Sequence, residues 1–370
     1  MTETFEIFLT ATPGLEAALY AEALEKGFAG AAVTQGGVTF QGTWEDVWRA
    51  NLVMRGATRV LARVGSFMAF HLAQLDKRSR KFPWSDILRA DVPVRVEVST
   101  SKKSHIYHAG AATQRIETAL KDSHGMTISP DAQIVIKVRI DDNRVTISLD
   151  TSGESLHKRG HKEAVGKAPM RETLAALMLR ECGYTGHEPV LDPMCGSGTF
   201  LIEAAEIALG LNPGRSRSFA FEQLATFDAV KWEAMRKQFP VHRADIPHFY
   251  GSDRDAGAIR MSRANAERAD VSKLITFENL SASDIQRPEG PPGLIICNPP
   301  YGGRIGNPKL LYGLYASLGE TLRDRFIGWR VGIVTSETGL AKATGLPFKP
   351  KGAPIPHGGL KVWLFQTDPL

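Results

Sequence analysis

The sequence predicts an α/β protein in two parts: a strand-rich N-terminal part and a C-terminal part built on a mostly parallel sheet. Two observations predict this class. After residue 169, short apolar runs alternate with segments of helical periodicity, and repeated βα units imply a parallel sheet covered by helices. Before residue 155, alternating strands and turn residues dominate. The basic stretch from His157 to Lys162 separates the two parts, and we interpret it as a linker.

The composition of the 370-residue chain, 43% hydrophobic and 23% charged, is that of a globular protein. It lacks the run of about 18 apolar residues that a membrane span needs, and its acidic N-terminus does not resemble a signal peptide. The cysteines, Cys182, Cys195 and Cys297, are far apart and lack metal-binding spacing. We therefore expect a cytoplasmic protein without disulfides or a bound metal.

The net charge of +5 permits a polyanionic partner without requiring one. Its basic excess lies between residues 76 and 168, where 17 lysines and arginines face 12 acidic residues. Lys102 and Lys103 lie in a hydroxyl-rich loop that leads into a helix, a position that suits phosphate. A solvated surface loop explains the same residues.

The elements of the N-terminal part follow from apolar spacing and turn residues. Thr43, with Asp46 three residues later, predicts the start of a helix, and Gly36-Gly37 predicts a hairpin turn. We expect strands at Phe5–Thr10, Arg59–Val64, Val94–Val98, Ile134–Ile140 and Val145–Asp150, a hairpin over Val33–Phe40, and helices over Gly14–Lys26, from Thr43, and over Gly110–Lys121.

The C-terminal part begins with a helix for which Pro169 suits the first turn. Strands and helices then alternate. We expect strands at Val190–Leu191, His248–Asp253, Ile275–Phe277, Gly293–Cys297, Arg330–Thr335 and Gly359–Gln366, and helices over Met170–Glu181, Phe200–Leu209, Phe227–Gln238, Ala256–Ala269 and Leu310–Arg325.

Polar residues follow successive strands of the predicted sheet, where α/β proteins bind ligands. Gly196 and Gly198, after Asp192, allow a close backbone approach at a helix N-terminus. Asp253 could accept both hydroxyls of a ribose, although a helix N-cap explains it equally. Asp284 could face an adenine amine or be a solvated loop residue. Together these positions predict a site for a nucleotide-like ligand.

The run Asn298-Pro299-Pro300-Tyr301 follows the Gly293–Cys297 strand. Two prolines fix the backbone and remove two N–H donors, which leaves a stiff corner rich in acceptors. The side-chain oxygen of Asn298 and the carbonyl of Pro299 can hold a planar ring amine, and Tyr301 can stack on the ring. A plain strand-to-turn corner is the alternative for this run taken alone.

Three motifs resemble those of class I S-adenosylmethionine (SAM)-dependent amino-methyltransferases. They are Asp192–Gly198, Gly251–Asp255 and Asn298–Gly302. Within that class, the chain resembles bacterial THUMP-domain RNA guanine-N2 methyltransferases that act on large-subunit ribosomal RNA. The segments that carry this closer resemblance are Leu156–Gly160, Ala168–Thr173 and the opening Thr10–Glu16. The resemblance covers nearly the whole chain. It implies a ferredoxin-like segment over 1–60, a THUMP RNA-binding domain over 61–155, and a Rossmann-like methyltransferase domain over 156–370.

The resemblance also implies roles for single residues. Asp192, Gly196 and Gly198 would hold the methionine portion of SAM, Asp253 its ribose and Asp284 its adenine. Asn298, Pro299 and Tyr301 would hold the target base and its amine, and no metal is needed. Gly303-Arg304-Ile305 and His357-Gly358-Gly359 depart from the family pattern, which leaves the target nucleotide open.

Other readings remain open. The run Asn298–Tyr301 would serve adenine-N6 methylation of RNA or DNA equally, and protein-glutamine methyltransferases share it. A non-catalytic RNA-binding assembly factor is the alternative from another class, although intact glycines, Asp253 and Asn298 argue against a degenerate site. Lys102, Lys103, Lys158 and Arg159 are candidate RNA phosphate contacts, and surface solubility would account for them nearly as well.

Overall fold

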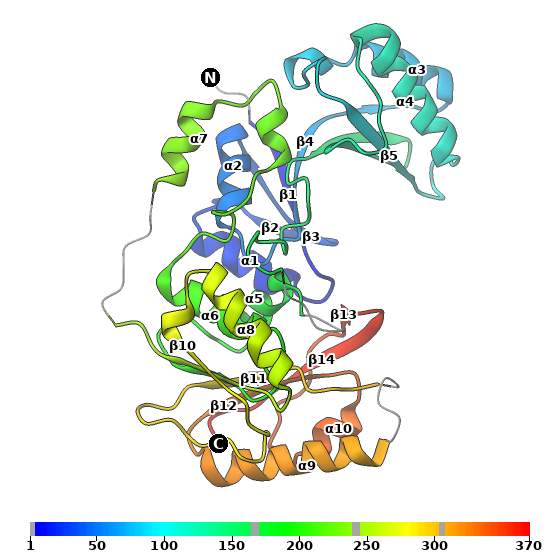
Figure 1. Ribbon diagram of the computed structural model, residues 1–370. Coiled ribbons are helices and arrows are strands. Elements are labelled where there is room, and N and C mark those ends of the chain that lie inside the picture. Colours follow the sequence, from blue (N-terminus) through cyan, green and yellow to red (C-terminus); the bar gives the residue numbers. More distant parts are fainter. Residues whose placement is uncertain (1–3, 164–169, 239–244, 303–307) are drawn as a thin grey trace. The chain divides into compact units, whose positions relative to one another are not determined.

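The computed structural model describes residues 4–163, 170–238, 245–302 and 308–370. Its contacts divide the chain into two units (Figure 1). The first contains the residues up to 11, 23–156 and 217–238, and the second contains 12–22, 157–216 and the residues from 239 on. Pro169 and the Gly303–Ile305 departure, both noted in the sequence, lie outside the described residues.

The first unit is built on a seven-stranded sheet with the order β2-β3-β1-β4-β7-β6-β5. Its neighbouring strands are antiparallel except β5 and β6, which are parallel. The strands are β1 (Phe5–Thr10), β2 (Ala32–Thr34), β3 (Gly37–Gly42), β4 (Arg59–Met68), β5 (Val94–Thr100), β6 (Ile134–Asp141) and β7 (Arg144–Asp150).

In the sequence, four α-helices lie between these strands: α1 (Glu16–Glu25), α2 (Trp44–Val53), α3 (Leu72–Lys81) and α4 (Ala109–His124). Most of α1 belongs to the second unit. The predicted start of α2 is confirmed, since the backbone N–H of Thr43 donates to the Asp46 carboxylate at 3.0 Å. Helix α3 was not predicted. Its second half contains four basic residues, Lys77, Arg78, Arg80 and Lys81.

The segment 217–238 belongs to the first unit, although in the sequence it lies inside the methyltransferase-like part. It contains α7 (Ala229–Arg236) and contributes Phe221 and Trp232 to the core of the first unit. The Phe221 ring stacks on Trp48 of α2 at 6.1 Å and meets Trp232 edge-on at 5.0 Å. Aromatic packing therefore holds this segment against the first unit.

The second unit is built on a seven-stranded sheet with the order β10-β9-β8-β11-β12-β14-β13. Its strands are β8 (Val190–Asp192), β9 (Phe249–Ser252), β10 (Ile275–Glu278), β11 (Leu294–Cys297), β12 (Arg330–Thr335), β13 (Ile355–His357) and β14 (Leu360–Gln366). The accompanying helices are α5 (Glu172–Glu181), α6 (Thr199–Leu209), α8 (Ala256–Arg268), α9 (Pro308–Arg325) and α10 (Thr338–Ala343).

The predicted α/β class is confirmed, and the sheet is parallel from β10 to β12. Strand β14 runs antiparallel to β12 and forms a hairpin with β13, an arrangement that the sequence did not predict. The chain passes outward through β8, β9 and β10 and returns to β11. This switch in direction brings the carboxyl ends of β8 and β11 together, where doubly wound sheets bind ligands.

The cysteines in the structure are free and buried. Within the described ranges, no helix is both long and apolar enough to span a membrane.

Candidate active site

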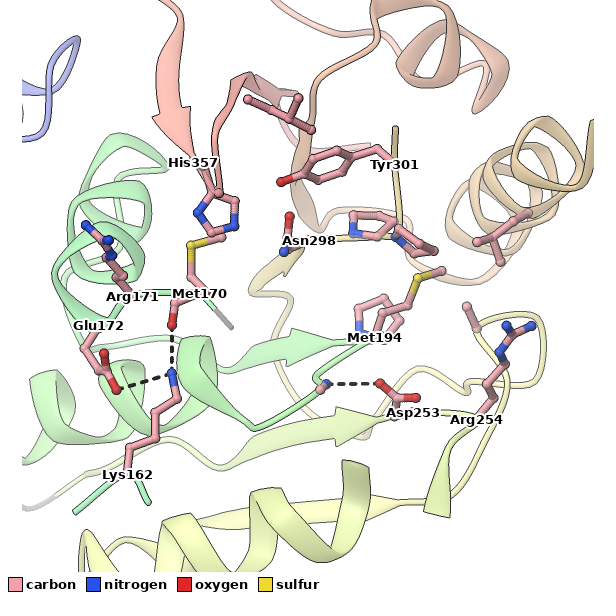
Figure 2. A pocket seen from close by; sticks show the side chains of 18 of the residues that line it. Lys162, Met170, Arg171, Glu172, Met194, Asp253, Arg254, Asn298, Tyr301 and His357 are labelled. Carbon is pink, nitrogen blue, oxygen red and sulfur yellow. Dashed lines mark hydrogen bonds and ion pairs between the residues drawn. The ribbon is translucent and has the colours of Figure 1, made fainter. Parts of the chain in front are cut away.

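A cavity of about 850 Å³ opens at the carboxyl ends of the strands of the second unit (Figure 2). Its walls include the turn after β8, the end of β9, the corner after β11 and the β13–β14 hairpin. Of the predicted site residues, six line this cavity: Lys158, Gly196, Asp253, Asn298, Pro299 and Tyr301. Asp192, Gly198, Asp284, Arg159, Lys102 and Lys103 are not among its lining residues.

The turn after β8 has the conformation that its glycines allow. Gly198 precedes α6 with φ of +82°, and a Cβ there would lie 3.0 Å from the Cβ of Ser262. Gly196 has φ of +54°, and a Cβ there would meet no protein atom within 4 Å. Because Gly196 also lines the cavity, a ligand can lie directly against its backbone.

The side chain of Asp192 stabilises this turn. The side chain is only 2% exposed, and one carboxylate oxygen accepts the backbone N–H of Met194 at 3.0 Å. Burial raises the pKa of this carboxyl, and the nearby charge of Asp253 adds to that rise. Asp192 thus shapes the turn, and Met194 rather than Asp192 faces the cavity.

Asp253 joins the loop after β9 to the loop after β8. Its carboxylate accepts the backbone N–H of Gly196 at 3.0 Å and that of Asp255 at 2.9 Å. Asn279 donates its amide to the backbone carbonyl of Asp253 at 2.8 Å. These bonds hold the carboxylate at the cavity wall, where it is partly exposed.

Asp284 lies farther along the same edge, with an exposed side chain that accepts the Ser283 hydroxyl at 3.2 Å. Ser281 and Ala282, just before it, line the cavity instead. Its backbone N–H donates to the carbonyl of Ser281 at 2.9 Å, so Asp284 lies in a turn that follows the lining residues.

The corner after β11 contains a hydrogen-bond acceptor that receives no donor from the described residues. The side-chain oxygen of Asn298 is buried and has no hydrogen-bond partner among the described residues. Leaving such an oxygen unpaired costs about 1–3 kcal/mol, so a donor that arrives with a ligand is favoured there. Asn298, Tyr301 and His357 are drawn around the same part of the cavity in Figure 2. The Tyr301 ring also packs on the hydrophobic core beneath it.

The stretch predicted to be a basic linker is instead folded into the second unit. The Arg159 guanidinium is 1% exposed and donates to the Glu203 carboxylate at 3.1 and 3.4 Å. His161 lies 3.3 Å from the carboxylate of Glu206, and burial lowers its pKa. The prediction that Arg159 contacts RNA phosphate is therefore wrong, because its charge is buried and neutralised.

Lys162 is buried as well and ties three elements together. Its ammonium group donates to the carbonyl of Met170 at 2.7 Å and to the hydroxyl of Thr199 at 2.9 Å. It lies 3.3 Å from the Glu172 carboxylate at the start of α5 (Figure 2). Because Thr199 begins α6, Lys162 braces the helix that follows the glycine turn.

The sequence reasoning missed several lining residues. Met170, Arg171 and Glu172 belong to a motif that marked the family resemblance, but no role was drawn from them. His157 and Arg254 adjoin predicted residues, and His357 stands at a noted departure from the family pattern. The remaining candidates, Lys102 and Lys103, are exposed in the loop between β5 and α4 of the first unit.

Family comparisons agree with this architecture. A family profile of the RMKL-like methyltransferase domain matches residues 159–349, and one of the RlmL ferredoxin-like domain matches residues 6–61. A protein of Synechocystis sp., named provisionally as an RNA methyltransferase, is 32% identical over 371 residues. That alignment covers 98% of this chain and 96% of the relative.

Several crystal structures match this chain over its full length, and two of them bear on its chemistry. One, of a protein named provisionally as a methyltransferase, was solved in complex with S-adenosylhomocysteine (SAH). It has a TM-score of 0.87 at 28% identity and is covered to 99%. The other, from Listeria monocytogenes, is described as a predicted N6-adenine-specific DNA methylase. It has a TM-score of 0.85 at 29% identity and is covered to 97%.

Proposed function

Because the chain belongs to the family of RMKL-like methyltransferase domains, we propose that it methylates the exocyclic N2 amine of a guanosine in RNA, specifically in large-subunit ribosomal RNA of the cytoplasm. The cofactor is SAM, in keeping with the SAH complex of a structural relative. The observation that carries the proposal is the buried oxygen of Asn298, which lines the cavity with Tyr301 and has no hydrogen-bond partner in the part of the chain that the structure describes. It suits an incoming amine held on a planar ring.

The cavity fits the cofactor on the evidence of Gly196. A Cβ at Gly196 would enter open space, so the turn leaves room for a ligand against its backbone. We assign Gly196, Gly198 and the supporting Asp192 to the methionine portion of SAM, Asp253 to its ribose hydroxyls and Asp284 to its adenine amine. SAM, when bound, supplies an activated methyl group.

The remaining work is alignment, which the chain's own residues perform. The target base leaves its stack to enter the cavity, as bases must for chemistry on the ring. The Asn298 oxygen and the Pro299 carbonyl accept the two amine N–H groups and so fix the direction of the nitrogen lone pair. Tyr301 holds the ring in plane with the amine. The proton that the nitrogen must lose leaves to solvent.

Three observations support RNA as the bearer of the base. The Synechocystis relative, named as an RNA methyltransferase, aligns over nearly the whole chain. The RlmL ferredoxin-like match at residues 6–61 supports our ferredoxin-like segment over 1–60. Lys102, Lys103 and Lys158 are exposed cations that can contact phosphate. We assign residues 61–155 to a THUMP RNA-binding domain and 156–370 to the methyltransferase domain.

Adenine-N6 methylation is the second candidate, because the Asn298 corner would hold either ring amine. The Listeria relative, described as an N6-adenine DNA methylase, keeps this alternative in view. Mass mapping of ribosomal RNA nucleosides from cells lacking the protein separates the two. We expect loss of one N2-methylguanosine, whereas loss of N6-methyladenosine would establish the alternative.

The variant Asn298→Ala tests the site itself. We expect SAH binding by calorimetry to stay within about twofold of wild type, and methyl transfer to undermethylated ribosomal RNA to fall about 100-fold or more, because amine alignment is lost. Unchanged turnover in this variant would remove Asn298 from the mechanism. A wild-type protein that binds RNA but no SAH would support the assembly-factor reading instead.

A further inference from the structure

One wall of the cavity carries basic residues to which the roles above assign no cofactor contact. His157, Lys158 and Arg171 all line it, from the chain just before α5 and from the N-cap of that helix. The side chains of Lys158 and Arg171 are exposed, so they stand where the cavity meets solvent. Arg171 makes no ion pair with any residue that the structure describes.

Arg171 differs from two basic residues near it in the sequence. Arg159 is buried on Glu203, and Lys162 is held by Glu172 and two oxygen acceptors. Their charges are neutralised by the fold. The acidic residues that line the cavity have other partners. Glu172 pairs with Lys162, Glu163 lies 3.9 Å from Arg268, and Asp253 accepts two backbone N–H groups.

His157 lines the same wall and contributes a hydrogen-bonding group there. Burial and the charges of Arg171, Arg159, Lys162 and Lys158 lower the pKa of His157 to about 4. The imidazole is therefore neutral at physiological pH, and it can donate one hydrogen bond without adding a charge. An anion placed here would meet two exposed cations and a neutral donor.

The substrate strand brings such an anion to this position. When a base turns into a cavity, its own ribose and phosphate must remain at the mouth. The amine end of that base lies at Asn298, deep in the cavity, so the phosphate lies toward solvent. Arginine binds phosphate through two parallel N–H donors, and lysine adds a point charge. The carboxylate of the methionine portion would lie deeper, against the Gly196 turn.

We propose that Arg171, together with Lys158 and His157, binds the backbone phosphate of the nucleotide whose base enters the cavity. This inference rests on the proposed function, since it requires a nucleic-acid strand as substrate. It replaces Arg159, which the fold buries, by Arg171 as the arginine that contacts the strand.

Arg171→Ala tests this assignment, with Arg260→Ala as the matched control. Arg260 is also an exposed arginine of the second unit, and it does not line the cavity. We expect Arg171→Ala to weaken binding of a single-stranded ribosomal RNA fragment about tenfold or more, as loss of a charged hydrogen bond does. A plot of log affinity against log salt concentration has a negative slope, and its magnitude should decrease by about 0.7 for the lost phosphate contact. Arg260→Ala should change neither quantity measurably.

Two further measurements make the result decisive. SAH binding by calorimetry should be unchanged in Arg171→Ala, and Arg171→Lys should restore most of the salt slope because the charge remains. A loss of SAH affinity without a loss of RNA affinity would assign Arg171 to the methionine carboxylate and overturn the inference. Equal behaviour of the Arg171 and Arg260 variants would overturn it as well. Wild-type protein that binds no RNA would overturn the proposed function and this inference together.

Discussion

The ion pair between Arg159 and Glu203 is the most consequential single contact that the sequence concealed. Both side chains are 1% exposed. Removing one partner leaves an uncompensated buried charge, so we expect Arg159→Met to lower the free energy of unfolding by about 3–5 kcal/mol. The double variant Arg159→Met, Glu203→Leu should recover most of that loss. Urea titration measures both values.

An exposed pair provides the control for that experiment. Lys349 and Asp368 lie 2.6 Å apart with side chains 49% and 78% exposed. Lys349→Ala should change the free energy of unfolding by less than about 1 kcal/mol, because water screens the pair. A loss of similar size in the Lys349 and Arg159 variants would show that burial is not the cause.

His157 gives the protein a pH-dependent stability. Its pKa is about 4 in the folded protein, below the ordinary 6.5, so the unfolded chain binds a proton more readily between these values. The free energy of unfolding is therefore highest above pH 6.5 and falls as the pH drops toward 4. Because the imidazole is partly exposed, we expect a contribution of about 1–2 kcal/mol.

His157→Gln should remove this part of the pH profile. We expect the difference in unfolding free energy between pH 7 and pH 4 to shrink by about 1–2 kcal/mol relative to wild type. An identical slope in both proteins would mean that His157 titrates normally. Urea unfolding at half-unit pH steps, with wild type in parallel, measures the effect.

At the scale of single residues, the sequence predicted those site residues whose position depends only on the neighbouring sequence. Asn298 and Asp253 directly follow strands, so their position at the cavity wall could be predicted from the βα pattern alone. Arg159 could not be judged in this way, because its burial depends on Glu203, a carboxylate 44 residues later on α6. A run of basic residues looks the same in sequence whether it is solvated or paired.

Helix α9 carries two glycines that differ in surroundings. A Cβ at Gly319 would lie 1.9 Å from the backbone carbonyl of Thr344, the C-cap of α10, whereas a Cβ at Gly313 would meet no atom within 4 Å. Gly319 thus allows α9 and α10 to pack closely. Neither glycine has the positive φ that would require glycine for backbone reasons.

Alanine at the two positions should have opposite effects. Gly319→Ala should destabilise the protein by about 1–3 kcal/mol through overpacking, while Gly313→Ala should stabilise it by about 0.5–1 kcal/mol through helix propensity. Thermal and urea unfolding measure both. If Gly319→Ala were neutral, α10 would have to shift readily against α9.

Two of the elements that the sequence did not predict are too short to show a pattern. Helix α10 has six residues and β13 has three, too few for either periodicity to be visible. The strand predicted at Gly359–Gln366 was placed correctly, but alternation carries no information on direction, so its antiparallel pairing with β12 could not be foreseen. Gly358 and Gly359 both have positive φ, as a tight hairpin turn requires.

In the whole molecule, segments that are neighbours in the sequence do not always pack in the same hydrophobic core. Residues 217–238 follow the first strand and helix of the methyltransferase sheet, yet they pack in the first unit. The sequence predicted the helix over Phe227–Gln238 but not its place in the first unit, because the aromatic residues of this segment find their partner more than 150 residues earlier, at Trp48. Local patterns predict elements well and such distant pairings poorly.

The variant Phe221→Ala tests this division of the molecule. Phe221 is fully buried, and its ring meets Trp48, Trp232 and two other aromatic rings. Truncation should cost about 3–5 kcal/mol in the first unit. We therefore expect faster hydrogen exchange in peptides from α2 and β7, with β8 and β11 exchanging as in wild type.

Val230→Ala is the matched control, because Val230 lies on α7 and is 81% exposed. It should leave exchange unchanged in every peptide. If Phe221→Ala accelerated exchange in β8 and β11 and spared α2 and β7, the segment would belong energetically to the methyltransferase sheet. The expected pattern, in contrast, means that the methyltransferase part of the sequence contributes a structural segment to its neighbour, so that neither unit corresponds to an uninterrupted stretch of chain.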